Sequence, residues 1–198
     1  MHRLLSTPRL KFKGLGRRQY QYFDTDDNVL ASVRQIEGER PRGKLGRLLA
    51  NERDYSRTVL QALSPDGAPV FIIERPDEGQ EQSIAPIVYT SDGSRAGRVD
   101  ADPLVDGRGI DKSRILQFRW ELRDVHDAVQ CRAEQRASKM ALRIKQEALS
   151  KKVDFTDASG SRIALFDGKW LDVNHQLPDV LQLLVVASPI AFDLLDGA

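Results

Sequence analysis

The sequence has little cysteine and none of the common catalytic motifs. Cys131 is the only cysteine among 198 residues, so no disulfide can form within the chain and a reducing compartment fits it best. Gly-x-Ser-x-Gly, His-Glu-x-x-His and paired Cys-x-x-Cys do not occur, which excludes the standard hydrolase and zinc signatures. We therefore expect a protein that is not an enzyme, with no catalytic residues, no metal and no cofactor.

Long apolar runs are also missing. Residues 1–5 are basic but lack the apolar core of about 7–15 residues that a secretory signal needs. In the most apolar segment, 180–195, no unbroken apolar run exceeds five residues, whereas a membrane-spanning helix needs about 20 predominantly apolar residues. We expect a cytoplasmic protein that is not transmembrane and that can meet a membrane only as a peripheral protein.

A strong net charge is absent, but the charges are unevenly spread. Lys plus Arg number 30 and Asp plus Glu 29, and no helix-turn-helix or RNA-binding motif is visible, which argues against nucleic acid as a partner. Residues 1–50 nevertheless hold eleven basic side chains against five acidic ones, whereas from residue 154 onward seven Asp face only Arg162 and Lys169. This asymmetry is typical of a protein with a basic and an acidic face, although scattered solvated charge explains it as well.

Five stretches repeat one pattern, in which an alternating apolar run, a turn centred on Asp and a second alternating run follow one another. Alternation indicates half-buried strands, and Asp, Asn and Gly suit tight turns. Ser64-Pro65-Asp66-Gly67 is the strongest turn signal, and Gly97 is expected to relieve crowding in its strand. The predicted hairpins are 20–23 with 29–34, 59–63 with 70–75, 87–89 with 96–99, 116–122 with 129–134, and 153–155 with 163–166.

Two segments are predicted to lie outside this pattern. Residues 1–14 are expected to form a basic lead-in to a single domain of residues 15–198, because Gly14 and Gly16 interrupt regular structure there. Residues 135–150 are ambiguous, since their apolar residues fit helical spacing and some also alternate. Their Ala, Glu, Gln, Lys and Arg content favours a helix.

Residues 178–195 are predicted to form a helix that is apolar on nearly every side. Pro178 and Asp179 suit its first turn, and twelve of the sixteen residues from 180 to 195 are apolar. Such a helix lies in a large core or spans a membrane, and a closed barrel can surround it with apolar strand faces while leaving no sheet edge exposed. The sequence therefore predicts a mainly β protein, an antiparallel β-barrel closed around a buried C-terminal helix.

Hairpins in series, a closing Leu-Pro-Asp segment and an apolar terminal helix resemble the tubby C-terminal-like superfamily, in particular its phospholipid scramblase and LURP-one-related branches. The matching stretches are 63–67 with 70–76, 88–93 with 96–99, 153–166 and, most specific, 177–195. The resemblance implies about twelve strands around a central hydrophobic helix. It leaves activity open, because the superfamily includes phosphoinositide-binding members, membrane-tethered members and proposed scramblases. The scramblases' calcium-binding segment and palmitoylated cysteine cluster have no clear copy here, which argues against scramblase activity.

The residues that suggest chemistry have simpler structural explanations. His126 and Cys131 resemble a base and a nucleophile, but Cys131 shares a strand face with Val129 and Ala133 and is expected to pack as a small hydrophobe. Residues 24–28 offer carboxylate oxygens to calcium, yet they lack the 12-residue loop and its bidentate Glu. We expect Asp24 to serve the turn instead.

Basic side chains gather on two glycine-rich segments that flank the first hairpin. Cations near an anionic bilayer contribute about 1 kcal/mol each, and guanidinium groups bind phosphate oxygens in a forked geometry. The candidate ligand-binding residues are Lys11, Lys13, Arg17 and Arg18, then Arg40, Arg42, Lys44 and Arg47. The two tryptophans, Trp120 and Trp170, are expected in the core rather than at an interface.

Two functions fit these observations. The first is a non-enzymatic module that binds the head groups of anionic phospholipid or phosphoinositide through basic loops at a membrane surface. The second is a protein-interaction or regulatory scaffold without a small ligand, whose loops meet a protein partner. Neutralising residues 38–47 separates the two hypotheses if it abolishes binding to that partner.

Overall fold

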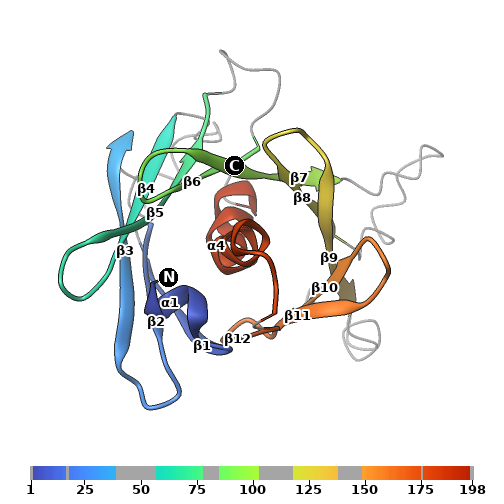
Figure 1. The fold of residues 1–198 in the computed structure, drawn as a ribbon, viewed down its shortest axis with the longest axis horizontal. Helices are drawn as coiled ribbons and strands as arrows, with labels where there is room; N and C mark the ends of the chain where they lie inside the picture. The colour runs from blue at the N-terminus through green and yellow to red at the C-terminus, as the bar shows by residue number, and fades with distance from the viewer. Residues whose placement is uncertain are drawn as a thin grey trace, which may run out of the picture.

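The structure is a computed structural model, and it describes residues 2–16, 18–38, 57–77, 85–102, 118–137, 149–174 and 176–196. Within these ranges twelve antiparallel strands close into a barrel, because each strand pairs with its neighbours in sequence and β1 pairs with β12. Figure 1 shows helix α4 inside the ring of strands. The strands are β1 (Arg9–Gly16), β2 (Gln19–Phe23), β3 (Val29–Gly38), β4 (Thr58–Leu63), β5 (Pro69–Arg75), β6 (Ile87–Thr90), β7 (Arg95–Asp102), β8 (Phe118–Asp124), β9 (Val129–Ala137), β10 (Leu149–Asp157), β11 (Arg162–Phe166) and β12 (Trp170–Val173), and the helices are α1 (Arg3–Ser6) and α4 (Asp179–Asp196).

All five predicted hairpins are confirmed within the described residues, which leave out 116 and 117 of the fourth, and their turns share one geometry. In each, the first residue of the turn donates to the carbonyl four positions on, and the fourth residue donates back to the first. The fourth residue has a left-handed backbone, as expected for a type I turn followed by a bulge. These left-handed residues are Asp27, Gly67, Gly93, Asp127 and Gly160, with φ of 63°, 85°, 84°, 63° and 82°.

Aspartate fixes these turns through its own side chain. The Asp24 carboxylate accepts hydrogen bonds from the N–H groups of Asp26 and Asn28, both at 2.9 Å, and Asp157 accepts in the same way from Ser159 and Ser161. The side-chain bond from Asn28 lowers the pKa of Asp24, against an opposing effect of burial. The expectation that Asp24 serves the turn is therefore confirmed.

The prediction that residues 1–14 form a lead-in is wrong for residues 9–14, which belong to a strand of the barrel. β1 begins at Arg9 and pairs with β2 on one side and β12 on the other, and Leu4 and Leu10 are fully buried. Closure of the ring provides partners for both edges of β1, which outweighs the weak strand preference of glycine. The register shifts only between Gly14 and Gly16, at the end of the strand.

The helix predicted for residues 135–150 is wrong at both ends. Residues 135–137 belong to β9 and residues 149–150 to β10, and Leu149 pairs with Ala137. The remaining residues, 138–148, lie outside the described ranges. Strand pairing at the two ends overrides the helix-favouring composition.

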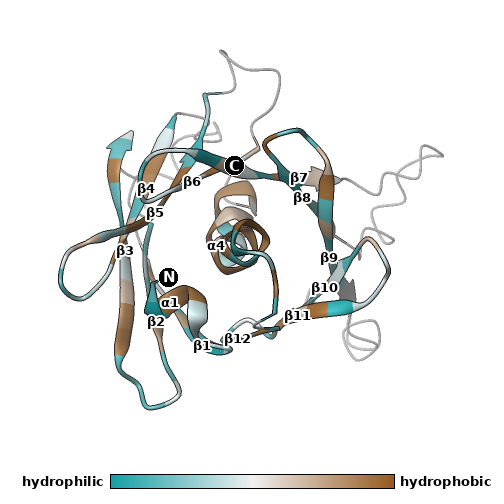
Figure 2. Cartoon of the chain, viewed as in Figure 1, coloured by the Kyte–Doolittle hydropathy of each residue, from teal (hydrophilic) through white to brown (hydrophobic). Residues whose placement is uncertain are grey.

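The predicted C-terminal helix is confirmed and forms the centre of the core. α4 runs from Asp179 to Asp196, and nearly all of its side chains from 181 to 194 are buried against the inward faces of the strands. Figure 2 shows hydrophobic colour over most of α4 and alternating colours along the strands. Among the described residues, no helix is long and apolar enough to span a membrane.

Polar groups from two strands, β2 and β5, fix α4 in the barrel. The Tyr22 hydroxyl donates to the Val186 carbonyl at 2.7 Å, and the Tyr20 hydroxyl donates to the Asp193 carboxylate at 2.5 Å. The guanidinium of Arg75 is buried and donates to the Leu194 carbonyl at 3.2 Å. The Arg75 cation satisfies a carbonyl in the last turn of α4 and complements the negative end of the helix dipole.

Three glycine-to-alanine variants test this description. A Cβ at Gly97 would lie 2.0 Å from the Arg123 carbonyl oxygen, which confirms the expected crowding, whereas at Gly67 it meets nothing but the φ is positive. We expect Gly97→Ala to lower the free energy of unfolding by at least about 2 kcal/mol and Gly67→Ala by about 1 kcal/mol. Gly14→Ala, where a Cβ meets only Tyr20 at 3.9 Å, is the control and should change stability by less than about 0.5 kcal/mol. Equal losses in urea denaturation for all three would contradict the geometry.

Candidate functional site

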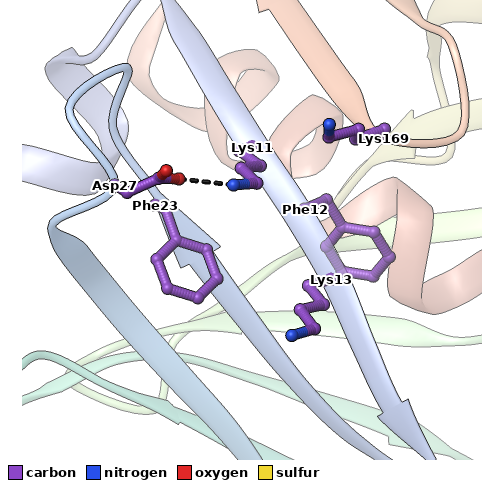
Figure 3. A pocket seen from close by; sticks show the side chains of 6 residues that line it. All are labelled: Lys11, Phe12, Lys13, Phe23, Asp27 and Lys169. Atoms are coloured by element: carbon purple, nitrogen blue, oxygen red, sulfur yellow. Dashed lines mark hydrogen bonds and ion pairs between the residues drawn. The ribbon is translucent and has the colours of Figure 1, made fainter.

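Two of the predicted basic residues line one pocket. Lys11 and Lys13 lie there, whereas Arg18 does not and donates instead to the Thr58 hydroxyl at 2.7 Å. The other five, Arg17, Arg40, Arg42, Lys44 and Arg47, lie outside the described residues. The pocket has a volume of about 440 Å³. Its lining residues are Lys11, Phe12, Lys13, Phe23, Asp27 and Lys169 (Figure 3).

Strand alternation places the lysines of β1. Leu10 is fully buried, and the Phe12 ring packs against the rings of Tyr20 and Tyr22 with centroids 5.6 and 5.2 Å apart. Because successive side chains of a strand point to opposite faces, Lys11 and Lys13 lie on the other face, about 7 Å apart along the strand. Figure 3 shows them on the same side of β1 as Phe23.

The register of three strands brings aromatic rings beside Lys11. Lys11 pairs with Phe23 on β2 and with Trp170 on β12. The Lys11 ammonium lies 5.7 Å from the centroid of the Phe23 ring, and the Arg9 guanidinium lies 4.9 Å from that of Trp170. These are distances at which a cation is attracted to an aromatic face.

The two tryptophans therefore have different surroundings. Trp120 is 3% exposed and stacks on Phe192 of α4 with centroids 4.1 Å apart, which confirms its place in the core. Trp170 is only half-buried and contacts the cations of Arg9 and Lys169. The prediction for Trp170 is wrong because Leu171 and its alternate neighbours occupy the inward face of β12.

Lys169 comes from the turn between β11 and β12, and the sequence did not single it out. The Asp167 carboxylate accepts from the N–H of Lys169 at 2.9 Å, and the Lys169 carbonyl accepts from the Phe12 N–H at 2.7 Å. These bonds hold the turn against β1. Lys169 is an isolated base in an acidic segment, so only the pairing of β1 with β12 shows that it joins the cluster.

The pocket has an excess of positive charge. It contains three ammonium groups and one carboxylate, and Lys11 forms an ion pair with Asp27. Lys13 and Lys169 form no ion pair with any residue in the described ranges. Each ammonium offers three N–H donors and no acceptor. The arrangement is suited to holding an anion with several oxygens.

The residues that the sequence suggested for a metal, a base or a nucleophile have structural roles. The described residues contain no group of three or more His, Cys, Asp or Glu side chains able to hold a metal ion. Cys131 is 1% exposed, and burial raises the pKa of its thiol to about 12. His126 lies in the β8–β9 turn, where its N–H donates to Asp124.

Comparisons with family models, with curated proteins and with solved structures found no match for the chain. The fold and the pocket therefore define the protein by their own features, as a closed antiparallel barrel around a central helix with a lysine-lined pocket beside β1. Membership of the tubby C-terminal-like superfamily stays a prediction from the sequence.

The environment of Cys131 predicts an unreactive thiol. At pH 8 the raised pKa leaves the thiol protonated, and burial blocks access. We expect a chromogenic disulfide reagent to label Cys131 only as fast as the protein unfolds, and to label it at once in concentrated urea. Rapid stoichiometric labelling of the native protein would contradict this burial.

Proposed function

We propose that the protein is a non-enzymatic binding module that engages the anionic head groups of phospholipids, phosphoinositides included, at a membrane surface. The main support for this proposal is the pocket, which is lined by three lysines and a single carboxylate. Two of these lysines have no acidic partner among the described residues. Phosphate oxygens are natural partners for such ammonium groups.

The surroundings of the pocket favour a lipid surface over a free anion. Phe23 and the half-exposed Trp170 lie on either side of Lys11, and Arg9 stacks on Trp170. Aromatic rings with basic side chains are typical of protein surfaces that meet the interfacial region of a bilayer. The resemblance to a superfamily with phosphoinositide-binding members supports the same proposal.

The charges indicate weak and reversible binding. Lys11, Lys13, Lys169 and Arg9 at about 1 kcal/mol each give at most about 4 kcal/mol near an anionic surface, which corresponds to a Kd of about 1 mM. Asp27 and Asp172 pair with Lys11 and Arg9, so the affinity is weaker than this limit. Such an interaction depends on ionic strength and on the density of head groups. We therefore propose a cytoplasmic protein that is recruited to membranes rich in anionic lipid.

Removing the charges of the pocket should abolish recruitment. We expect the triple variant Lys11→Gln, Lys13→Gln, Lys169→Gln to bind vesicles of phosphatidylcholine with phosphatidylinositol 4,5-bisphosphate at least tenfold more weakly in flotation. The matched control removes three exposed charges from β3, β7 and β11 through Arg34→Gln, Arg95→Gln and Arg162→Gln. This control should bind within about twofold of the wild type, because charges away from the pocket act only through a screened field.

Trp170 reports in the same experiment which face meets the bilayer. In a Trp120→Phe variant Trp170 is the only tryptophan, and brominated lipid in the vesicles should quench its fluorescence. Equal loss of binding in both triple variants would show diffuse attraction rather than a site. If the wild type does not float with anionic vesicles, the proposal is wrong and the protein-interaction scaffold becomes the better hypothesis.

A further inference from the structure

The pocket contains its own anion. Asp27 is the one acidic residue among the six that line it, and its carboxylate pairs with Lys11. The side chain of Asp27 is 66% exposed, whereas that of Lys11 is 25% exposed. The carboxylate is therefore open to solvent, whereas its partner ammonium comes from a more buried side chain.

The turn geometry does not require aspartate at this position. Asp27 has a φ of 63°, in the left-handed region that favours glycine. Three of the five turns with the same geometry use glycine there, namely at Gly67, Gly93 and Gly160. The turn alone therefore does not require the Asp27 side chain, and its interaction with Lys11 is what distinguishes it.

Asp127 provides an internal comparison. It occupies the same left-handed position in the β8–β9 turn and pairs with Arg98 at 2.8 Å. Arg98 also pairs with Asp100 at 2.9 Å, so Asp127 adds to an existing network. Lys11 has no acidic partner other than Asp27 among the described residues.

We propose that Asp27 is a built-in counter-ion, which an anionic ligand must displace from Lys11, and that it thereby lowers the affinity of the pocket for anionic head groups, for phosphomonoesters more than for phosphodiesters. This inference rests on the proposed function. A phosphodiester carries one negative charge, whereas a phosphomonoester carries about −1.5 to −2 at pH 7. Lys13 and Lys169 attract the more negative ligand more strongly, and the nearby Asp27 carboxylate repels it more strongly.

Asp27→Asn tests this role with little change in shape. Asparagine tolerates the left-handed backbone and keeps the size of the side chain, but it removes the charge. Asp127→Asn makes the same change on a hairpin that β10 and β11 separate from β12. Thermal unfolding of both variants checks that each remains folded.

The probes are phosphatidylcholine vesicles with either phosphatidic acid, a phosphomonoester, or phosphatidylglycerol, a phosphodiester, adjusted to equal surface charge. We expect the wild type to prefer phosphatidic acid. Asp27→Asn should bind phosphatidylglycerol vesicles about fivefold more tightly than the wild type, the effect of removing one like charge at a solvated site. It should bind phosphatidic acid vesicles more tightly still, so that its preference for phosphatidic acid exceeds that of the wild type. Asp127→Asn should behave as the wild type.

Titration with glycerol 3-phosphate and with its methyl diester, without vesicles, distinguishes the source of the phosphate. An Asp27 effect on the soluble esters assigns the selectivity to the phosphate group alone, and an effect on vesicles only assigns it to a head group presented at a surface. Both results support the role of Asp27. No effect in either format overturns it.

Different results would contradict the role of Asp27 and the binding of anionic lipid. If Lys13→Gln weakens vesicle binding but Asp27→Asn leaves the preference unchanged, the role of Asp27 is wrong and the lipid site stands. Weaker binding by Asp27→Asn would show that the carboxylate contacts the ligand, which also overturns the inference. If the wild type and Asp27→Asn both ignore anionic vesicles, the proposed function is wrong as well.

Discussion

The burial of α4 inside the ring of strands is the interaction on which the rest of the structure depends. A fully buried Val, Leu, Ile or Phe side chain contributes about 1.5–3 kcal/mol, and α4 buries Leu181, Leu183, Leu184, Val185, Val186, Ile190, Phe192 and Leu194. Their combined contribution, about 12–24 kcal/mol, is as large as or larger than the roughly 5–15 kcal/mol by which a domain is usually stable. Neither part can therefore do without the other, because the strands need an apolar centre and the helix needs a wall on every side.

This mutual burial also decides where function can lie. The inward positions of the strands are committed to packing, and polar groups at the core, such as Tyr22 and Arg75, are used to fix the helix. Charge is left to the alternate positions on the outside and to the turns. The pocket beside β1 combines both sources, since Lys11 and Lys13 come from a strand while Asp27 and Lys169 come from turns. The pairing of the barrel strands thus brings side chains from distant parts of the sequence to one site.

Local patterns explain what the sequence could predict. The five hairpins and α4 follow from alternation, turn residues and apolar content within short segments, and the structure confirms all of them. The strands β1 and β12 were missed because their pairing joins the two ends of the chain, and that closure has no local signal. Lys11 and Lys13 were chosen for their charge, yet their common face with Phe23 and their proximity to Lys169 depend on the register between strands. The helix expected near residues 135–150 failed for the same reason, because pairing between β9 and β10 outweighs composition.

The central claim, that barrel and helix form one cooperative unit, is tested most directly through Trp120. In a Trp170→Phe variant Trp120 is the only tryptophan, and its ring stacks on Phe192 of α4 with centroids 4.1 Å apart. Its fluorescence therefore reports the docking of the helix, while far-ultraviolet circular dichroism reports the strands. We predict that both signals change together, with one midpoint, as urea is raised. A change in Trp120 fluorescence at lower urea, with the strand signal intact, would show that the barrel persists without its helix and would contradict the account.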